Sequence, residues 1–198
     1  MTRLPAVTDR DAGLSAKIAF YFMKRHFARL TGRDNDSMLG PVRIMAHIPK
    51  LLSGYGKVEQ AVAKVYLLDL RHRALAELKA ATTVRCEYCI DLGSRVSRDW
   101  GLSDQELLAL PNYHNAKCFS DVDKLVLDYA SAMSRTPVEV TDELFDKLRG
   151  QFNTPQLVEL TFIIALENLR GRFNLAMGIG AAGFSEGMVC AIPEGPRS

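Results

Sequence analysis

Apolar side chains recur at steps of three and four residues along most of the chain, and almost nowhere do they alternate with polar ones. Steps of three and four place side chains on one face of an α-helix, whereas strict alternation is typical of a β-strand. The pattern therefore predicts an all-α fold, a single-domain helical bundle of about eight helices.

Capping residues, prolines and glycines mark where these helices begin and end. Asp69 is a candidate N-cap, as is Ser120 or Asp121. Ser103 and Glu106 have the spacing of a capping box, and Thr154 followed by Pro155 is typical of a helix start. The apolar positions that outline the first helix are Leu14, Ile18, Tyr21 and Phe22. The predicted helices lie around residues 14–30, 42–47, 58–67, 69–83, 84–100, 103–110, 121–136, 141–150 and 155–177.

The chain of 198 residues is the length of one globular domain. We expect an N-terminal helical extension over residues 1–37, the helical domain over residues 38–185 and a C-terminal tail over residues 186–198. The longest apolar stretch, residues 157–169, is interrupted by two glutamates and is too short to span a bilayer. It predicts a buried core helix that includes Phe162, and no association with a membrane.

Charge and composition exclude several classes of protein. The net charge is +2, with both signs interspersed, so the basic face typical of a nucleic-acid-binding protein is absent. The N-terminus lacks the apolar segment of a secretory signal, and we therefore expect a cytoplasmic protein. No nucleotide, flavin or haem motif is present, so no cofactor is expected.

The most informative motif is the Cys-x-x-Cys of Cys86 and Cys89, which the pattern places in the first turn of a helix. The helix N-terminus and Arg85 favour the thiolate form of a nearby cysteine. Such a thiolate attacks peroxides and disulfides, and the second thiol can resolve the resulting sulfenic acid. The pair is thus a candidate redox dithiol, with Cys86 nearer the positive end of the helix.

Two alternatives to a redox dithiol remain open. Together with His114 and Cys118, the pair would supply four ligands of the types that zinc accepts, although the 24-residue gap between the two halves is long. The pair can also be structural, two buried cysteines without chemistry. In either case the protein would be a non-redox helical protein.

The residues around the pair resemble a known family. Residues 79–110, KAATTVRCEYCIDLGSRVSRDWGLSDQELLAL, are similar to the alkylhydroperoxidase D-like branch of the carboxymuconolactone decarboxylase family. Supporting segments are RIMAHIPKLL upstream and TPQLVELTFIIALENLRGRFNLAMGIGAAGFSEGMVC downstream. The resemblance covers roughly residues 38–190.

This resemblance implies an alkylhydroperoxidase D-like helical fold, a homo-oligomer, and a thiol-dependent peroxidase that needs no metal. It implies that Cys89 attacks the peroxide substrate and that Cys86 resolves the sulfenic acid, although the helix terminus favours the reverse. A dithiol reductant, which the sequence does not identify, would reset the disulfide.

Two positions depart from the pattern of the peroxidases in this family. Gly93 stands where they carry a proton-relay histidine, and Ala74 stands where they carry a glutamate. Glu77, one turn along the same helix, is the nearest substitute for that glutamate. Glu167, with Asn174 on the long C-terminal helix, is a second candidate to reach the cysteine pocket and replace the relay.

The remaining candidates are weaker. Gly93 predicts either close helix packing or space for a substrate beside Cys89. His72 can approach the site from the start of its helix, whereas Asp91 should point away from the sulfur of Cys89. The family name also suggests a lactone decarboxylase, but that chemistry requires a proton-transfer group that the motif lacks.

Overall fold

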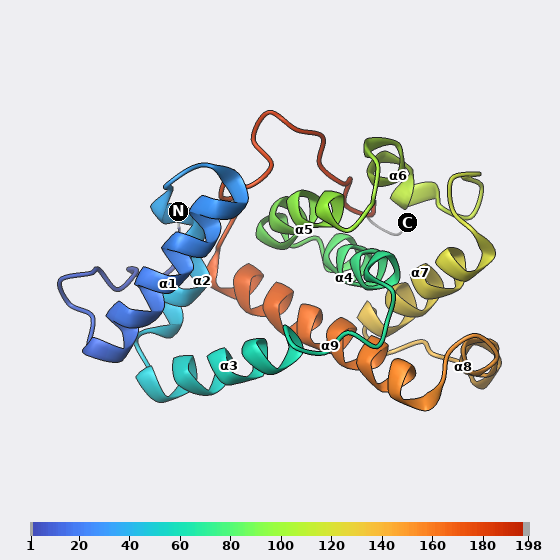
Figure 1. The fold of residues 1–198 in the computed structure, drawn as a ribbon, viewed down its shortest axis with the longest axis horizontal. Helices are drawn as coiled ribbons and strands as arrows, with labels where there is room; N and C mark the ends of the chain where they lie inside the picture. Colours follow the sequence, from blue (N-terminus) through green and yellow to red (C-terminus); the bar gives the residue numbers. More distant parts are fainter. Residues whose placement is uncertain (1, 196–198) are drawn as a thin grey trace.

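The computed structural model describes residues 2–195, and these contain nine α-helices, two short 3₁₀ helices and no β-strand (Figure 1). The all-α prediction is confirmed. The elements are α1 (Leu14–Thr31), η1 (Asp36–Leu39), α2 (Gly40–Met45), α3 (Pro49–Val62), α4 (Leu70–Val84), α5 (Glu87–Asp99), α6 (Asp104–Ala109), η2 (Leu110–Asn112), α7 (Asp121–Ser134), α8 (Asp142–Arg149) and α9 (Thr154–Met177).

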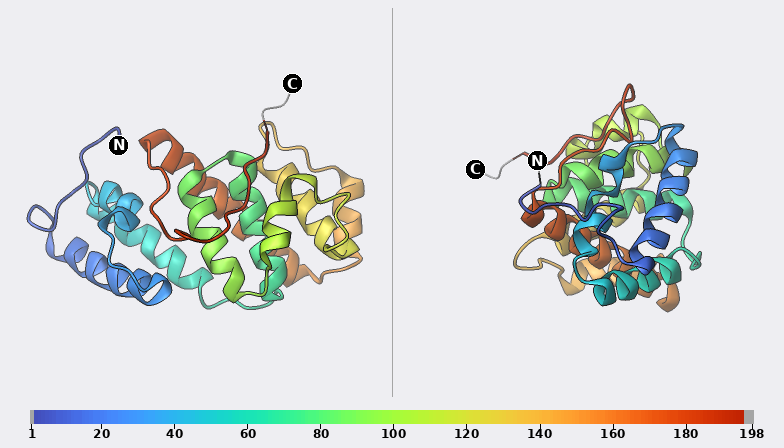
Figure 2. Two further views of the ribbon diagram at one scale, coloured as in Figure 1. Left: turned by 90° about the horizontal axis from the view of Figure 1, so that it is seen from above. Right: turned by 90° about the vertical axis from the view of Figure 1, so that its left-hand side faces the viewer.

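Helix α4 is the centre of the molecule. It packs against α5, α7 and α9, and Figures 1 and 2 show these helices grouped around it, with α1, α2 and α3 gathered at one end. Small and aliphatic side chains line α4 on nearly every side, so neighbouring helices can approach closely. Its fully buried residues include Leu75, Ala76, Leu78, Ala80 and Ala81.

Local signals place the two ends of α4. Asp69 caps its N-terminus by accepting a hydrogen bond from the Arg71 N–H at 2.8 Å, as the sequence predicts. Arg85 ends it in the left-handed conformation with φ +62°. The chain therefore turns sharply before α5 begins, at Glu87 instead of the predicted residue 84.

Other boundaries differ from the predictions in a similar way. Helix α3 begins at Pro49 and ends at Val62, because the proline sits in its first turn, whereas the apolar pattern predicts a helix over residues 58–67. Asn153, not Thr154, caps α9, and it forms a capping box with Gln156. The capping box at Ser103 is confirmed.

Two apolar helix faces lie at the surface. In α1 the outlining residues Leu14, Ile18, Tyr21 and Phe22 are all exposed, and the helix packs instead through Ala16, Phe20 and Phe27. In α9 the predicted core residue Phe162 is 49% exposed. Helical spacing shows that a face is apolar, but it cannot show what covers that face.

Between α9 and residue 195 the chain contains no helix, and it crosses the outside of α5 (Figure 1). Asp91 holds its first part, because its carboxylate accepts hydrogen bonds from the backbone N–H groups of residues 182–185. Glu194 holds its last part through an ion pair with the buried Lys79. Residue 1 of the expected extension and residues 196–198 of the expected tail lie outside the described residues.

Within residues 2–195, no helix is both long enough and apolar enough to cross a bilayer.

Candidate functional site

The cysteine pair lies at the N-terminus of α5, as the sequence predicts. Cys86 is the N-cap residue and Cys89 is in the first turn, with the Cys89 N–H donating to the Cys86 sulfur at 3.2 Å. The two form a disulfide, with their Cα atoms 5.2 Å apart. Cys86 is fully buried and Cys89 is 6% exposed, so Cys89 is the more accessible residue of the two.

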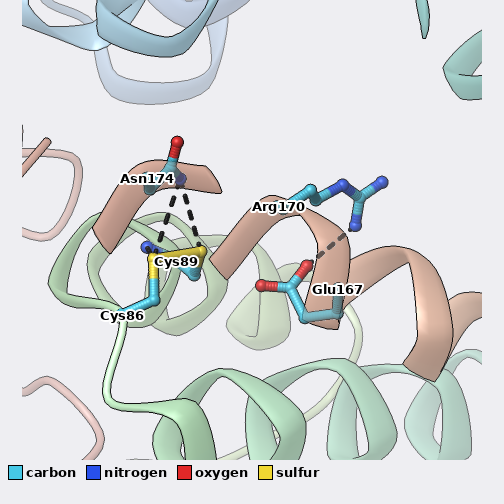
Figure 3. Close-up of a disulfide and its surroundings, with 5 residues drawn as sticks. All are labelled: Cys86, Cys89, Glu167, Arg170 and Asn174. Carbon is cyan, nitrogen blue, oxygen red and sulfur yellow. Dashed lines mark hydrogen bonds and ion pairs between the residues drawn. A yellow bond between two sulfur atoms is a disulfide. The ribbon is translucent and has the colours of Figure 1, made fainter. Parts of the chain in front are cut away.

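Asn174 on α9 contacts both sulfur atoms. Its side-chain Nδ2 lies 3.6 Å from the Cys89 sulfur and 3.7 Å from the Cys86 sulfur, and Figure 3 shows the amide lying across the disulfide. Asn174 is 2% exposed, and its Oδ1 has no hydrogen-bond partner among the described residues. The amide thus points two N–H bonds at the atoms that would carry negative charge in the reduced pair.

Gly171 lets α9 come this close to the cysteines. A Cβ at Gly171 would lie 2.7 Å from Val84 Cγ2 and 3.5 Å from the Cys86 Cβ, so a larger residue would push the helices apart. Helical periodicity does not predict this contact, although the sequence contains a signal for it. A glycine inside a long helix costs about 1 kcal/mol relative to alanine, and this one precedes Asn174 by a single turn.

Glu167 shares the face of α9 that carries Gly171 and Asn174, because the steps between the three are four and three residues. Figure 3 shows its carboxylate on the same side of the helix as the disulfide. One oxygen accepts from Arg170 Nη1 at 2.8 Å. Burial raises the pKa of Glu167 to about 7, although Arg170 opposes the shift. The group can therefore hold or release a proton near neutral pH.

Glu77 belongs to a buried cluster of charges between α3, α4 and α9. Its Oε1 lies 3.5 Å from Arg73 Nε and 4.0 Å from Arg170 Nη1, and Arg170 also pairs with Glu59. Burial raises the pKa of Glu77, while the two arginines lower it. Its polar contacts among the described residues are to these charged groups and not to a cysteine.

The two positions where the relay residues of the peroxidases are missing, Gly93 and Ala74, lie in closely packed parts of the structure. A Cβ on Gly93 would lie 3.0 Å from Leu78 Cδ1, so Leu78 of α4 occupies the space in which a histidine would have to fit. Ala74 is 3% exposed and part of the core. Close helix packing therefore accounts for Gly93, and a bound substrate is not needed to explain it.

The remaining candidate residues make their contacts with groups other than the cysteine pair. His72 faces Asp123 Oδ1 at 3.6 Å and the ring of Phe152. Asp91 points away from the sulfurs, as expected, and holds the chain after α9. In the part of the chain that the structure describes, no three His, Cys, Asp or Glu side chains could together hold a metal ion. The four-ligand zinc site with His114 and Cys118 is therefore not assembled.

Comparison with known proteins places the chain in a family. No protein-family model matches it. It is 38% identical over 172 residues to the uncharacterized protein YnjA of Escherichia coli (strain K12), an alignment that covers 84% of this chain and 90% of YnjA. The chain belongs to the YnjA family. A second relative, the uncharacterized protein YdfG of Bacillus subtilis (strain 168), is 28% identical over 111 residues, which is 56% of this chain and 76% of YdfG.

Solved structures identify the fold of this YnjA-family chain. The alkylhydroperoxidase AhpD core of a peroxidase-related protein from Ralstonia eutropha JMP134 superposes with a TM-score of 0.70 at 16% identity, covering 91% of this chain and 92% of the other. The debrominase Bmp8, in complex with 2,3,4-tribromopyrrole, superposes with a TM-score of 0.73 at 18% identity, covering 92% and 95%. The expected alkylhydroperoxidase D-like fold is confirmed.

Proposed function

We propose that the protein is a thiol-dependent peroxidase that reduces hydrogen peroxide or an organic hydroperoxide with Cys86 and Cys89. One observation carries the proposal: two sulfur atoms lie together at a helix N-terminus, where the Cys89 N–H points at the Cys86 sulfur and the Asn174 amide points at both. Hydrogen bonds and a positive helix end stabilise a thiolate. A thiolate next to a second thiol is the arrangement that two-electron peroxide reduction needs.

The difference in burial supports an attacking role for Cys89 and a resolving role for Cys86. The Cys89 thiolate attacks the terminal peroxide oxygen, an S–O bond forms, the O–O bond breaks and an alcohol or water leaves with a proton. The Cys86 thiolate then attacks the Cys89 sulfur, which forms the disulfide and releases the sulfenic oxygen as water with a second proton. Cys89 has the only exposed part of the pair, and Cys86, held by the N–H of Cys89, is already placed for the second step.

Glu167 is the proposed proton donor and acceptor. It replaces the family relay from the opposite side, on α9 instead of α4 and α5, because Leu78 fills the space beside Gly93. Its pKa of about 7 lets it be protonated when the leaving oxygen needs a proton. Glu77, which raises the pKa of Glu167 by its charge, supports this role through the cluster around Arg170.

A dithiol reductant must complete the cycle. It attacks the Cys86–Cys89 disulfide, supplies two electrons and is itself oxidised to a disulfide, which leaves the two cysteines reduced. Thiol reductants of this class are maintained in reducing compartments, so the proposal places the protein in the cytoplasm. Neither a bound cofactor nor a metal takes part in the proposed cycle.

The assignment of roles is tested by trapping the intermediate. In a Cys118→Ser, Cys190→Ser background, Cys86→Ser treated with hydrogen peroxide and dimedone should carry the sulfenic acid adduct on residue 89. The matched variant Cys89→Ser should give little adduct at Cys86. The reverse distribution would exchange the roles, and no adduct in either variant would contradict the peroxidase.

The same variants separate the alternatives. A structural cysteine pair predicts that both substitutions lower the free energy of unfolding without any peroxide reactivity in the parent protein. A zinc-binding pair predicts that metal copurifies with the parent and is lost in both variants. Turnover of a carboxylated lactone that persists without the cysteines would support the decarboxylase.

A further inference from the structure

Helix α9 carries a second apolar face that points to solvent. Its positions are spaced alternately by three and four residues, the repeat by which helices pair in a coiled coil. All of them are exposed, and they are Pro155, Val158, Phe162, Ala165, Leu169 and Arg172. The opposite face, which includes Leu160, Ile163 and Ile164, is fully buried in the core. We call the exposed positions the outer seam of α9.

Two hollows flank the outer seam, one toward each end of the helix. The first has a volume of about 310 Å³ and is lined by the seam residues Ala165 and Arg172, together with Met133 and Val138. The second has a volume of about 250 Å³ and is lined by Pro155, Val158 and Phe162, together with Val65 and Leu67. The surface is therefore one apolar ridge with a recess at either end.

We infer that the outer seam is the interface between two copies of this chain, paired antiparallel about a two-fold axis at Ala165. With such an axis, a residue that precedes Ala165 in one copy lies opposite the residue that follows Ala165 by the same number of positions in the other copy. Phe162 of one copy then faces the larger recess of its partner, beside Asn168. Leu169 faces the smaller recess, beside Thr161. A small residue at the crossing point lets the two helices approach closely.

Charge selects the antiparallel arrangement. Arg172 is the one charged residue of the outer seam, and it has no carboxylate partner among the described residues. Parallel helices would bring the two Arg172 side chains together, which is unfavourable. Antiparallel helices separate their Cα atoms by roughly 20 Å, since each lies seven residues from the axis at 1.5 Å per residue.

The exposed apolar area matches what a dimer requires. Val65, Leu67 and Val138 are 37%, 50% and 62% exposed, and the seam residues Val158, Phe162 and Leu169 are 63%, 49% and 53% exposed. Together they present on the order of 600 Å² before any rim is counted, close to the ~800 Å² that a standard interface takes from each partner.

The first test is the oligomeric state of surface variants, measured by sedimentation velocity at micromolar concentration. We expect the parent chain to be dimeric or a higher assembly of dimers, and Ala165→Arg to weaken this association at least about tenfold. Because Ala165 is exposed, the circular dichroism spectrum of the variant should match that of the parent. Leu14→Arg, on the other exposed apolar face at 77% exposure, is the control and should leave the α9 pair intact.

The second test uses the symmetry. In a Cys118→Ser, Cys190→Ser background, Ala165→Cys should form a covalent dimer on mild oxidation, because the axis places the two residues 165 together. Ala176→Cys, eleven residues from the axis, should not. A monomeric parent, association that survives Ala165→Arg but is lost in Leu14→Arg, or failure of Ala165→Cys to crosslink would each overturn the inference. Crosslinking at both positions would overturn the antiparallel arrangement.

Discussion

The side-chain amide of Asn174 lies 3.6 Å from the sulfur of Cys89, although the two residues are 85 positions apart in the chain. Gly171 makes this contact possible by letting α9 pack against the turn that ends α4 and carries Cys86. The Asn174 amide is therefore part of the dithiol site, as is the N-terminus of α5. In a chain without the family histidine and glutamate, Asn174 is the polar group of α9 that contacts the pair, and Glu167 lies on the same face of that helix, paired with Arg170.

Replacing Asn174 by alanine should slow the reaction of the dithiol. The variant removes an N–H from a buried thiolate, and a hydrogen bond to a charged group contributes about 1.5–3 kcal/mol. We therefore expect alkylation of the reduced pair by iodoacetamide at neutral pH to slow at least about tenfold. Asn168→Ala is the matched control, since that amide bonds to Ser134 and Ile164 instead. Equal rates in both variants would remove Asn174 from the site.

Glu167→Gln should make stability less dependent on pH. The pKa of Glu167 is about 7 in the folded protein against an ordinary value of 4.5, so between these values the native state holds a proton that the unfolded state has lost. The free energy of unfolding contributed by this group is therefore greatest below pH 4.5 and is lost as pH rises through 7, a change on the order of 3 kcal/mol.

Urea denaturation at pH 5 and pH 8 measures this difference. The decrease in unfolding free energy between the two values should be smaller in Glu167→Gln than in the parent. The control is Glu143→Gln, an exposed residue paired with Lys147, which should retain the parent's decrease. The same decrease in all three proteins would show that Glu167 titrates normally.

Gly171→Ala should destabilise the protein, whereas Gly54→Ala should not. The added methyl at residue 171 would lie 2.7 Å from Val84 Cγ2, while nothing lies within 4 Å of a Cβ at Gly54 in α3. Overpacking costs about 1–3 kcal/mol, and an unstrained alanine in a helix gains about 0.5–1 kcal/mol over glycine. Chemical denaturation of the two variants should give changes of opposite sign. A stabilised Gly171→Ala would refute the close approach of α9.

Arg71→Met should lower the free energy of unfolding, because one guanidinium pairs with the capping-box carboxylates of two helices. Arg71 pairs with Glu106 and with Asp123, at 3.0 Å for the latter, and each carboxylate completes a capping box, at the start of α6 and α7 respectively. Both carboxylates are buried, so removing their partner should lower the unfolding free energy by about 2–4 kcal/mol. Arg149→Met, which breaks an exposed pair, should change it by less than about 0.5 kcal/mol.

Local signals in the sequence are sufficient to predict the helical class, most helix starts and the cysteine pair at the start of a helix. Asp69, Ser103 and Ser120 act through neighbours two or three residues away, which is why their roles can be predicted. The sequence predicts a break between α4 and α5, but places the start of α5 at residue 84 instead of Glu87. The exact position depends on one left-handed residue, Arg85, and glycine is the residue type that usually marks this conformation in a sequence.

Contacts between distant segments are harder to predict. The sequence makes Glu167 and Asn174 candidates, but only the packing at Gly171 shows that Asn174 meets both sulfurs. The fold also shows that Glu77 joins a charge cluster instead. For α9, apolar residues surround the helix, so periodicity cannot distinguish the core face from the outer seam. That distinction depends on which elements cover the helix, and it is set by the tertiary fold.

The most direct test of the proposed peroxidase is a single-turnover reaction of the reduced protein with one equivalent of cumene hydroperoxide. The fluorescence of Trp100, the only tryptophan, is the signal by which the reaction is followed. Peptide mass spectrometry then identifies which cysteines have been oxidised. We predict rapid loss of two thiols per chain into the Cys86–Cys89 disulfide, with one equivalent of the alcohol formed. If these two thiols stay reduced for minutes, or only Cys118 and Cys190 are oxidised, the protein is not a peroxidase of this kind.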